Sequence, residues 1–157
     1  MSSTGLIKSV SDSFTRPANT TQYTAGDLVA NNATAGSVVP LTFATGRGGI
    51  RVKQVAITKT DETDVTAADF SLHLFASSPT VANGDNGAIS YDFSSKFGDI
   101  DFATMVAATD VAWAFSSGLD LNTYTAAGTL YGLIEADGTY TPASAEVFSV
   151  TLIFERT

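Results

Sequence analysis

Strict alternation of side-chain character recurs along this sequence and restricts the fold more than any other feature. It is clearest near residue 150, where Phe148, Val150, Leu152 and Phe154 occupy every second position. A period of two places such residues on one face of an extended strand, whereas a helix needs a spacing near 3.6. We therefore predict a central strand here.

The same spacing predicts several further strands, separated by turns rich in glycine, asparagine and aspartate. These strands are expected at residues 38–43, 50–60, 70–75, 111–116 and 130–135. In the fourth of them, the alternation places Trp113 in the core. Pro40 has no backbone N–H to donate, so it indicates an edge or a bulge in the first.

The apolar residues of segment 50–60 change phase partway along. Ile50 and Val52 share one parity, and Val55 and Ile57 share the other. A β-bulge near Lys53 and Gln54 explains the change. The alternative is a strand whose two faces are both partly covered, as happens against a neighbouring subunit.

The predicted fold class is all-β: an antiparallel β-sandwich of jelly-roll type, with at most one short connecting helix. Phe102, Met105 and Val106 have helical spacing and place that helix within residues 101–108. Residues 14–157 are expected to form a single domain. For residues 1–13 the sequence leaves two alternatives, an N-terminal arm that orders against a partner or a strand at a sheet edge.

Charge argues against several kinds of partner. The 157 residues carry a net charge of -8 and no cysteine, so general nucleic-acid binding, disulfides and thiolate metal sites are not expected. No apolar run is long enough for a membrane helix, and no leader is evident, which predicts a soluble chain made in the cytoplasm without a signal peptide.

The charges are unevenly distributed along the chain. Residues 1–60 hold six of the eight basic residues but only two of the sixteen acidic ones. One face with affinity for an acidic partner would result if folding keeps the two halves apart. Folding that mixes the halves over one surface is the alternative.

Candidate catalytic groups are few. His73 is the only histidine and lies in the middle of a predicted strand, so a serine–histidine hydrolase or a zinc site is not expected. Carboxylates cluster at Asp61, Glu62 and Asp64 and at Asp99 and Asp101, without the spacing of a calcium loop. We predict no enzymatic activity, no cofactor and no metal; a glycan-cleaving enzyme with two facing carboxylates is the least favoured alternative.

Residues 13–29 read Ser-Phe-Thr-Arg-Pro-Ala-Asn-Thr-Thr-Gln-Tyr-Thr-Ala-Gly-Asp-Leu-Val. This run resembles the opening of tailed-bacteriophage virion structural proteins, in which Phe-Thr-Arg-Pro, a Thr, a Tyr and Gly-Asp precede a Thr- and Ala-rich β domain. The match covers about a tenth of the chain in detail. The resemblance implies a head decoration, or cement, protein of jelly-roll type on the capsid surface of the virion, often a homotrimer, whose partner is the major capsid protein.

A decoration protein that acts as a clamp between capsid subunits needs only to bind them, so it requires no catalytic residue. The residues that we expect to contact the capsid or another subunit, chosen by charge and position, are Leu6, Ile7, Phe14, Arg16, Arg47, Arg51, Lys53 and Lys59. A carbohydrate- or receptor-binding β-sandwich module on a virion is the alternative function, with exposed tyrosines as stacking platforms.

Overall fold

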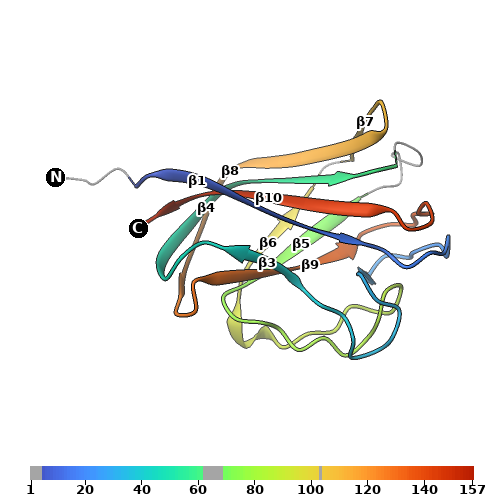
Figure 1. Ribbon diagram of the computed structural model, residues 1–157, viewed down its shortest axis with the longest axis horizontal. Helices are drawn as coiled ribbons and strands as arrows, with labels where there is room; N and C mark the ends of the chain where they lie inside the picture. Colours follow the sequence, from blue (N-terminus) through green and yellow to red (C-terminus); the bar gives the residue numbers. More distant parts are fainter. Residues whose placement is uncertain (1–4, 62–68, 103) are drawn as a thin grey trace.

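The computed structural model describes residues 5–61, 69–102 and 104–157, which form two antiparallel sheets packed face to face (Figure 1). The first sheet has the strand order β1-β10-β4-β8-β7. Its strands are β1 (Ile7–Thr15), β10 (Val147–Arg156), β4 (Gly48–Lys59), β8 (Val111–Thr125) and β7 (Val106–Ala108). The second sheet has the order β2-β9-β5-β6, with β3 also paired to β9. Its strands are β2 (Asp27–Val29), β9 (Thr129–Ala136), β5 (Phe70–Phe75), β6 (Lys96–Asp101) and β3 (Leu41–Ala44).

The strand pairing is nested. The first strand pairs with the last, β2 and β3 pair with the next to last, β4 pairs with β8, and β5 pairs with β6. A chain folded back on itself and rolled in this way is a jelly roll. The predicted fold class is therefore confirmed.

The alternation near the C-terminus builds the core as predicted. Phe148, Val150, Leu152 and Phe154 are all buried between the sheets, and β10 lies between β1 and β4. They face apolar side chains of the second sheet, among them Phe70, whose ring meets that of Phe148 edge-on at 5.3 Å. Burial of each such side chain stabilises the fold by about 1.5–3 kcal/mol.

The predicted bulge is confirmed. Against β10, Val52 pairs with Phe154 and Gln54 with Ile153, which leaves Lys53 as the extra residue. Against β8 the register also shifts here, because Val52 pairs with Leu121 and Gln54 with Ser117. The bulge reverses the parity of the strand at that point. Ile50 and Val55 therefore both point into the core despite their odd spacing, and both are fully buried.

Two predictions from spacing are wrong. The described residues of 101–108 form no helix: β6 ends at Asp101, and β7 begins at Val106. Phe102 and Met105 instead enter the core from an irregular connection between two edge strands. Among the described residues, the helical structure is a single 3-10 turn, η2 (Phe93–Ser95).

Trp113 is the second error, because β8 has the opposite phase to the one predicted. Ala112 and Ala114 are buried, while Trp113 and Phe115 point outward and are 37% and 51% exposed. The two small residues lie in the same core cluster as Phe102, which comes from the connection between β6 and β7.

Residues 7–13, for which the sequence left an arm or an edge strand open, lie in β1 at one edge of the first sheet. Val10 packs against the core, and the Asp12 carboxylate accepts the backbone N–H of Thr42 at 2.8 Å. This bond joins β1 to β3 in the other sheet. The edge strand thus helps to close one side of the sandwich.

Candidate interaction surface

Residues 13–29, the run singled out in the sequence, contribute side chains to the interior of the sandwich. Arg16 is 2% exposed, and its Nη2 lies 3.1 Å from Oδ2 of Asp85, both side chains being buried. Its Nε donates to the hydroxyl of Tyr23, which in turn donates to Asp85 at 2.5 Å. Asp85 also accepts the backbone N–H of Ala30 at 2.9 Å. One carboxylate therefore joins three separate segments of the chain.

A second buried ion pair adjoins the first. The rings of Tyr23 and Tyr140 stack with centroids 6.0 Å apart. The Tyr140 hydroxyl donates to Glu146 at 2.5 Å, and Glu146 pairs with Lys59 at 3.1 Å with both side chains buried. Burial, followed by the adjacent carboxylate, raises the pKa of each tyrosine well above its usual range, so both remain neutral donors.

Three of the eight expected contact residues are directed into the sandwich instead of toward its surface. Arg16 and Lys59 neutralise buried carboxylates, so the interpretation of these two as part of a basic surface is wrong. Phe14 points inward from β1 and stacks on Phe148 at 5.8 Å. Each of them stabilises the sandwich.

The other five converge at one end of the molecule. Ile7 lies opposite Glu155, and Arg51 also lies opposite Glu155 on the other flank of β10. Leu6 and Ile7 are 71% and 66% exposed. We call this region the terminal end; its expected contact residues are Leu6, Ile7, Arg47, Arg51 and Lys53.

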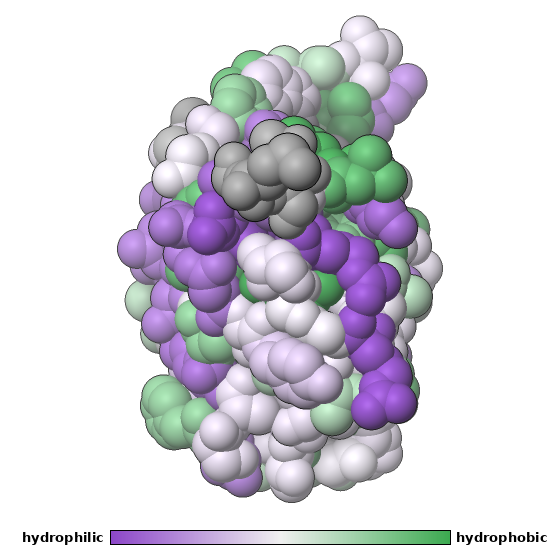
Figure 2. Space-filling view, turned by 90° about the vertical axis from the view of Figure 1, so that its left-hand side faces the viewer, coloured by the Kyte–Doolittle hydropathy of each residue, from purple (hydrophilic) through white to green (hydrophobic). Residues whose placement is uncertain are grey.

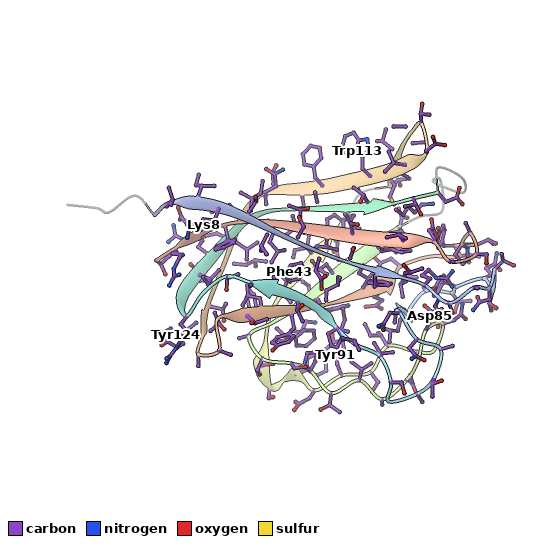
Figure 3. All side chains as sticks on the ribbon, viewed as in Figure 1. Lys8, Phe43, Asp85, Tyr91, Trp113 and Tyr124 are labelled. Atoms are coloured by element: carbon purple, nitrogen blue, oxygen red, sulfur yellow. The ribbon has the colours of Figure 1, made fainter. Side chains whose placement is uncertain are left out.

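Two basic residues of the terminal end were missed. Lys8 pairs with Phe154 in the β1–β10 register, and Arg156 donates through Nη2 to the carbonyl oxygen of Arg47. Figure 3 shows Lys8 and Tyr124 at this end and Asp85 at the opposite one. Pairing of the first strand with the last, a known property of jelly rolls, is the signal that would have brought them together.

The terminal end is predominantly basic. It holds Lys8, Arg47, Arg51, Lys53 and Arg156, against two acidic residues. Both acids pair with Arg51: Glu155 at 3.1 Å and Asp120 at 3.1 Å. Figure 2 views the molecule from this side and shows purple hydrophilic surface beside a green hydrophobic patch. A basic rim next to exposed aliphatic side chains is suited to an acidic protein partner.

The opposite end is acidic. Asp69, Asp101 and Asp137 line an open cavity of about 600 Å³ together with Ser71. Burial raises the pKa of Asp137, opposed by its bond to Ser71 and reinforced by nearby carboxylates. The terminal end and this cavity thus differ in charge, although residues from both halves of the chain meet at the terminal end, where Arg51 pairs with Asp120 and Glu155.

The carboxylates of the acidic end and the His73 ring are held by hydrogen bonds within the fold. Asp101 and Asp137 each lie 2.7 Å from the Ser71 hydroxyl, so one hydroxyl bridges the two carboxylates. His73 is held between Asp99 and Glu135, each 2.6 Å from one ring nitrogen, so both nitrogens are already engaged. Glu62 and Asp64 lie outside the described residues.

The side chains that surround His73 link neighbouring segments on the outer face of the second sheet. Burial alone would raise the pKa of Asp99, but hydrogen bonds and charges from Lys96 and His73 hold it below its usual range. Lys96 also donates to Tyr91 at 2.7 Å, which ties the long connection after β5 to the edge strand β6. In the described part of the chain, no three His, Cys, Asp or Glu side chains are placed to hold a metal ion. No helix among those residues is long and apolar enough to cross a membrane.

Comparison of the sequence with protein families found no matching family model, and no curated protein matches it. Among solved structures, a chain of the cyanophage Pam1 capsid is similar, with 16% identity and a TM-score of 0.41 over 98% of this chain and 86% of that one. A chain of the Ralstonia phage GP4 capsid has 14% identity and a TM-score of 0.39 over 94% and 84%. A capsid chain of Helicobacter pylori bacteriophage KHP30 has 9% identity and a TM-score of 0.33 over 96% and 93%. At these identities and TM-scores, the similarities carry no argument about the function of this chain.

Proposed function

We propose that this chain is a non-enzymatic virion structural protein that decorates and stabilises a bacteriophage capsid by binding the major capsid protein lattice. The observation that carries the proposal is the convergence at the terminal end of five residues chosen from the sequence for partner contact. The resemblance of residues 13–29 to phage virion proteins points to the same class of protein.

The terminal end has the components of a clamp. Leu6 and Ile7 offer apolar surface to desolvate, while Arg47, Arg51 and Lys53 supply charge that steers the approach to an acidic lattice. Binding across neighbouring capsomers stabilises a shell because the binding free energy must be overcome before they separate. The acidic far end then points away from the shell and repels other particles.

The test is cosedimentation of the purified protein with capsid shells that lack it. Replacing Arg51 and Lys53 by glutamine should weaken binding about tenfold or more, with a larger effect at low salt. The matched control replaces the exposed Thr139 and Ser144 by glutamate, which changes the net charge by the same amount away from the terminal end. Equal affinity of the two variants would refute the assignment of this surface.

The apolar part of the terminal end is tested separately. Leu6→Ser with Ile7→Ser removes exposed aliphatic surface without breaking the pairing of β1 with β10. Shell binding should weaken while the unfolding midpoint stays unchanged. A homotrimer, which the resemblance also implies, is part of the proposal and is measured by light scattering.

A second candidate function is carbohydrate or receptor binding, and Phe93 favours it. Its ring is exposed beside a cavity of about 360 Å³ that is also lined by Lys96, Phe97 and Asp99. An aromatic face next to charged hydrogen-bonding groups suits a sugar ring. A glycan-array signal abolished by Phe93→Ala, with shell binding absent, would replace the capsid proposal by this one.

A further inference from the structure

Arg47 of the terminal end lies in a turn whose backbone is intrinsically flexible. The turn joins β3 to β4 and places Arg47 between Gly46 and Gly48, whose φ angles are 81° and 124°. Glycine adopts such angles without strain, but it has more conformational freedom to lose than any other residue. Unless the fold already held this turn, ordering it would cost part of the free energy of binding a partner.

The turn between β8 and β9 holds the first half of the Arg47 turn. The backbone N–H groups of Thr45 and Gly46 both donate to the carbonyl oxygen of Gly128, at 2.9 and 3.0 Å. Gly128 is itself fixed by the buried residue Thr125, whose Oγ1 accepts the Gly128 N–H at 3.1 Å. The two neighbouring turns are therefore tied together.

Arg156 holds the second half of the turn. Its Nη2 donates to the carbonyl oxygen of Arg47, and its guanidinium lies so close to Gly46 that a Cβ there would overlap Nη1. Beside it, the backbone N–H of Thr157 donates to the carbonyl oxygen of Gly49 at 3.0 Å. Figure 1 shows the end of β10 and the turns that precede β4 and β9 at the same end of the molecule. Three segments that are far apart in the sequence thus hold the backbone that carries one exposed arginine.

The charges at this turn are not neutralised by the residues that the structure describes. Arg51 pairs with two carboxylates, whereas neither Arg47 nor Arg156 forms an ion pair with any described residue, and both are exposed. A guanidinium binds a carboxylate through two parallel charge-assisted hydrogen bonds, which makes carboxylates its preferred partners. The turn therefore offers a cation that is both uncompensated and held in place.

We propose that the turn that presents Arg47 receives a carboxylate group of the partner, and that Arg156 is the positioning residue that orders this turn before the partner binds. The inference rests on the proposed function, because the partner is the capsid lattice assigned there. Arg156 acts through the shape of its guanidinium as well as its charge, because a lysine keeps the charge but lacks the planar set of N–H groups. The entropy of ordering the turn is then lost on folding instead of on binding.

Cosedimentation with capsid shells that lack the protein tests both roles. Arg156→Lys preserves the charge and should weaken binding about fivefold to thirtyfold, which corresponds to ordering the backbone of one further residue. Lys8→Arg, an equally conservative exchange at an exposed position of the terminal end, is the matched control and should bind as the wild type does. Arg47→Gln should also weaken binding, and its effect should shrink at high salt, whereas the effect of Arg156→Lys should not.

Hydrogen exchange reports on the turn without any shell. The Thr45 and Gly46 amides should exchange at least tenfold faster in Arg156→Lys than in the wild type or in Lys8→Arg, at an unchanged melting temperature. Unchanged exchange or unchanged shell affinity in Arg156→Lys would overturn the positioning role, and unchanged affinity of Arg47→Gln would overturn the carboxylate site. A wild type that does not bind shells would instead refute the proposed function, and the carboxylate site with it.

Discussion

The buried pair of Arg16 and Asp85 allows a quantitative test of how this sandwich is held closed. Asp85→Asn keeps the shape of the side chain but removes its charge. The Arg16 guanidinium, fully buried in the fold, then has no counter-charge within the network formed with Tyr23. Desolvation of an uncompensated cation disfavours the folded state.

The expected loss is large for one substitution. Breaking a buried ion pair from one side costs about 3–5 kcal/mol. For a domain of this size, each 1 kcal/mol lowers the melting temperature by about 2–4 °C, so Asp85→Asn should lower it by roughly 10 °C. Arg51→Gln is the control, because its partners are partly exposed and such pairs contribute about 1 kcal/mol or less.

Urea unfolding followed by far-ultraviolet circular dichroism measures the free energy of unfolding of each variant. The double variant Arg16→Met with Asp85→Asn removes both charges, while the amide oxygen at position 85 can still accept from Tyr23 and Ala30. It should recover much of the loss, because no uncompensated charge is then buried. If Asp85→Asn costs no more than Arg51→Gln, or if the double variant is less stable than the single one, the reasoning is refuted.

Three further predictions concern stability. Asp137→Asn should stabilise the protein by up to about 1 kcal/mol at neutral pH. Because the pKa of Asp137 is raised in the folded state, the wild type loses stability as the pH rises through the folded pKa, so the advantage should vanish below about pH 4; urea unfolding at several pH values checks this. Deletion of Lys53 removes the bulge, so that the side chains of Ile50 and Val52 turn from the core toward water. The free energy of unfolding should fall by about 3–6 kcal/mol. A cooperative unfolding transition at the wild-type midpoint would contradict this prediction. Tyr140→Phe leaves Glu146 without one of its buried donors and should cost about 1–3 kcal/mol in thermal unfolding, whereas an unchanged melting temperature would count against a structural role for that hydroxyl.

The fold was predictable to the extent that period-two alternation specifies it. Alternation identifies strands, and their number with short turns identifies a sandwich. It also located the bulge, because the change of phase near Lys53 is visible in the sequence itself. The helix expected within residues 101–108 failed because three apolar residues at helical spacing also fit an irregular crossing between strands.

A sequence shows that a strand alternates more clearly than it shows which of the two alternating sets faces the core. In β8 both sets of alternating residues are apolar or small, so hydrophobicity favoured Trp113 and Phe115 for the core. In the fold the small residues Ala112 and Ala114 face the core instead, in one cluster with Phe102 from the connection between β6 and β7. Which set turns inward depends on volumes contributed by other segments, and one strand's sequence does not contain them.

The candidate site was half predictable for a related reason. Charge and position identified Arg47, Arg51 and Lys53, which share the terminal end. The same criteria also selected Arg16 and Lys59, whose partners Asp85 and Glu146 follow them by 69 and 87 residues. From the sequence alone, a basic residue on the surface cannot be distinguished from one that neutralises a buried carboxylate.

The placement of Arg16 changes what the resemblance to phage virion proteins means. The run from Phe14 to Asp27 is recognisable, yet Phe14, Arg16 and Tyr23 are used inside the sandwich, and Asp27 accepts the backbone N–H of Thr24 at 2.6 Å. Such a run therefore specifies how one end of a jelly roll is closed, and a chain with a different partner can use the same closure. The capsid proposal therefore assigns partner choice to the exposed side chains of the terminal end. Substitutions there should alter shell binding without altering stability, and substitutions in the recognisable run should do the reverse.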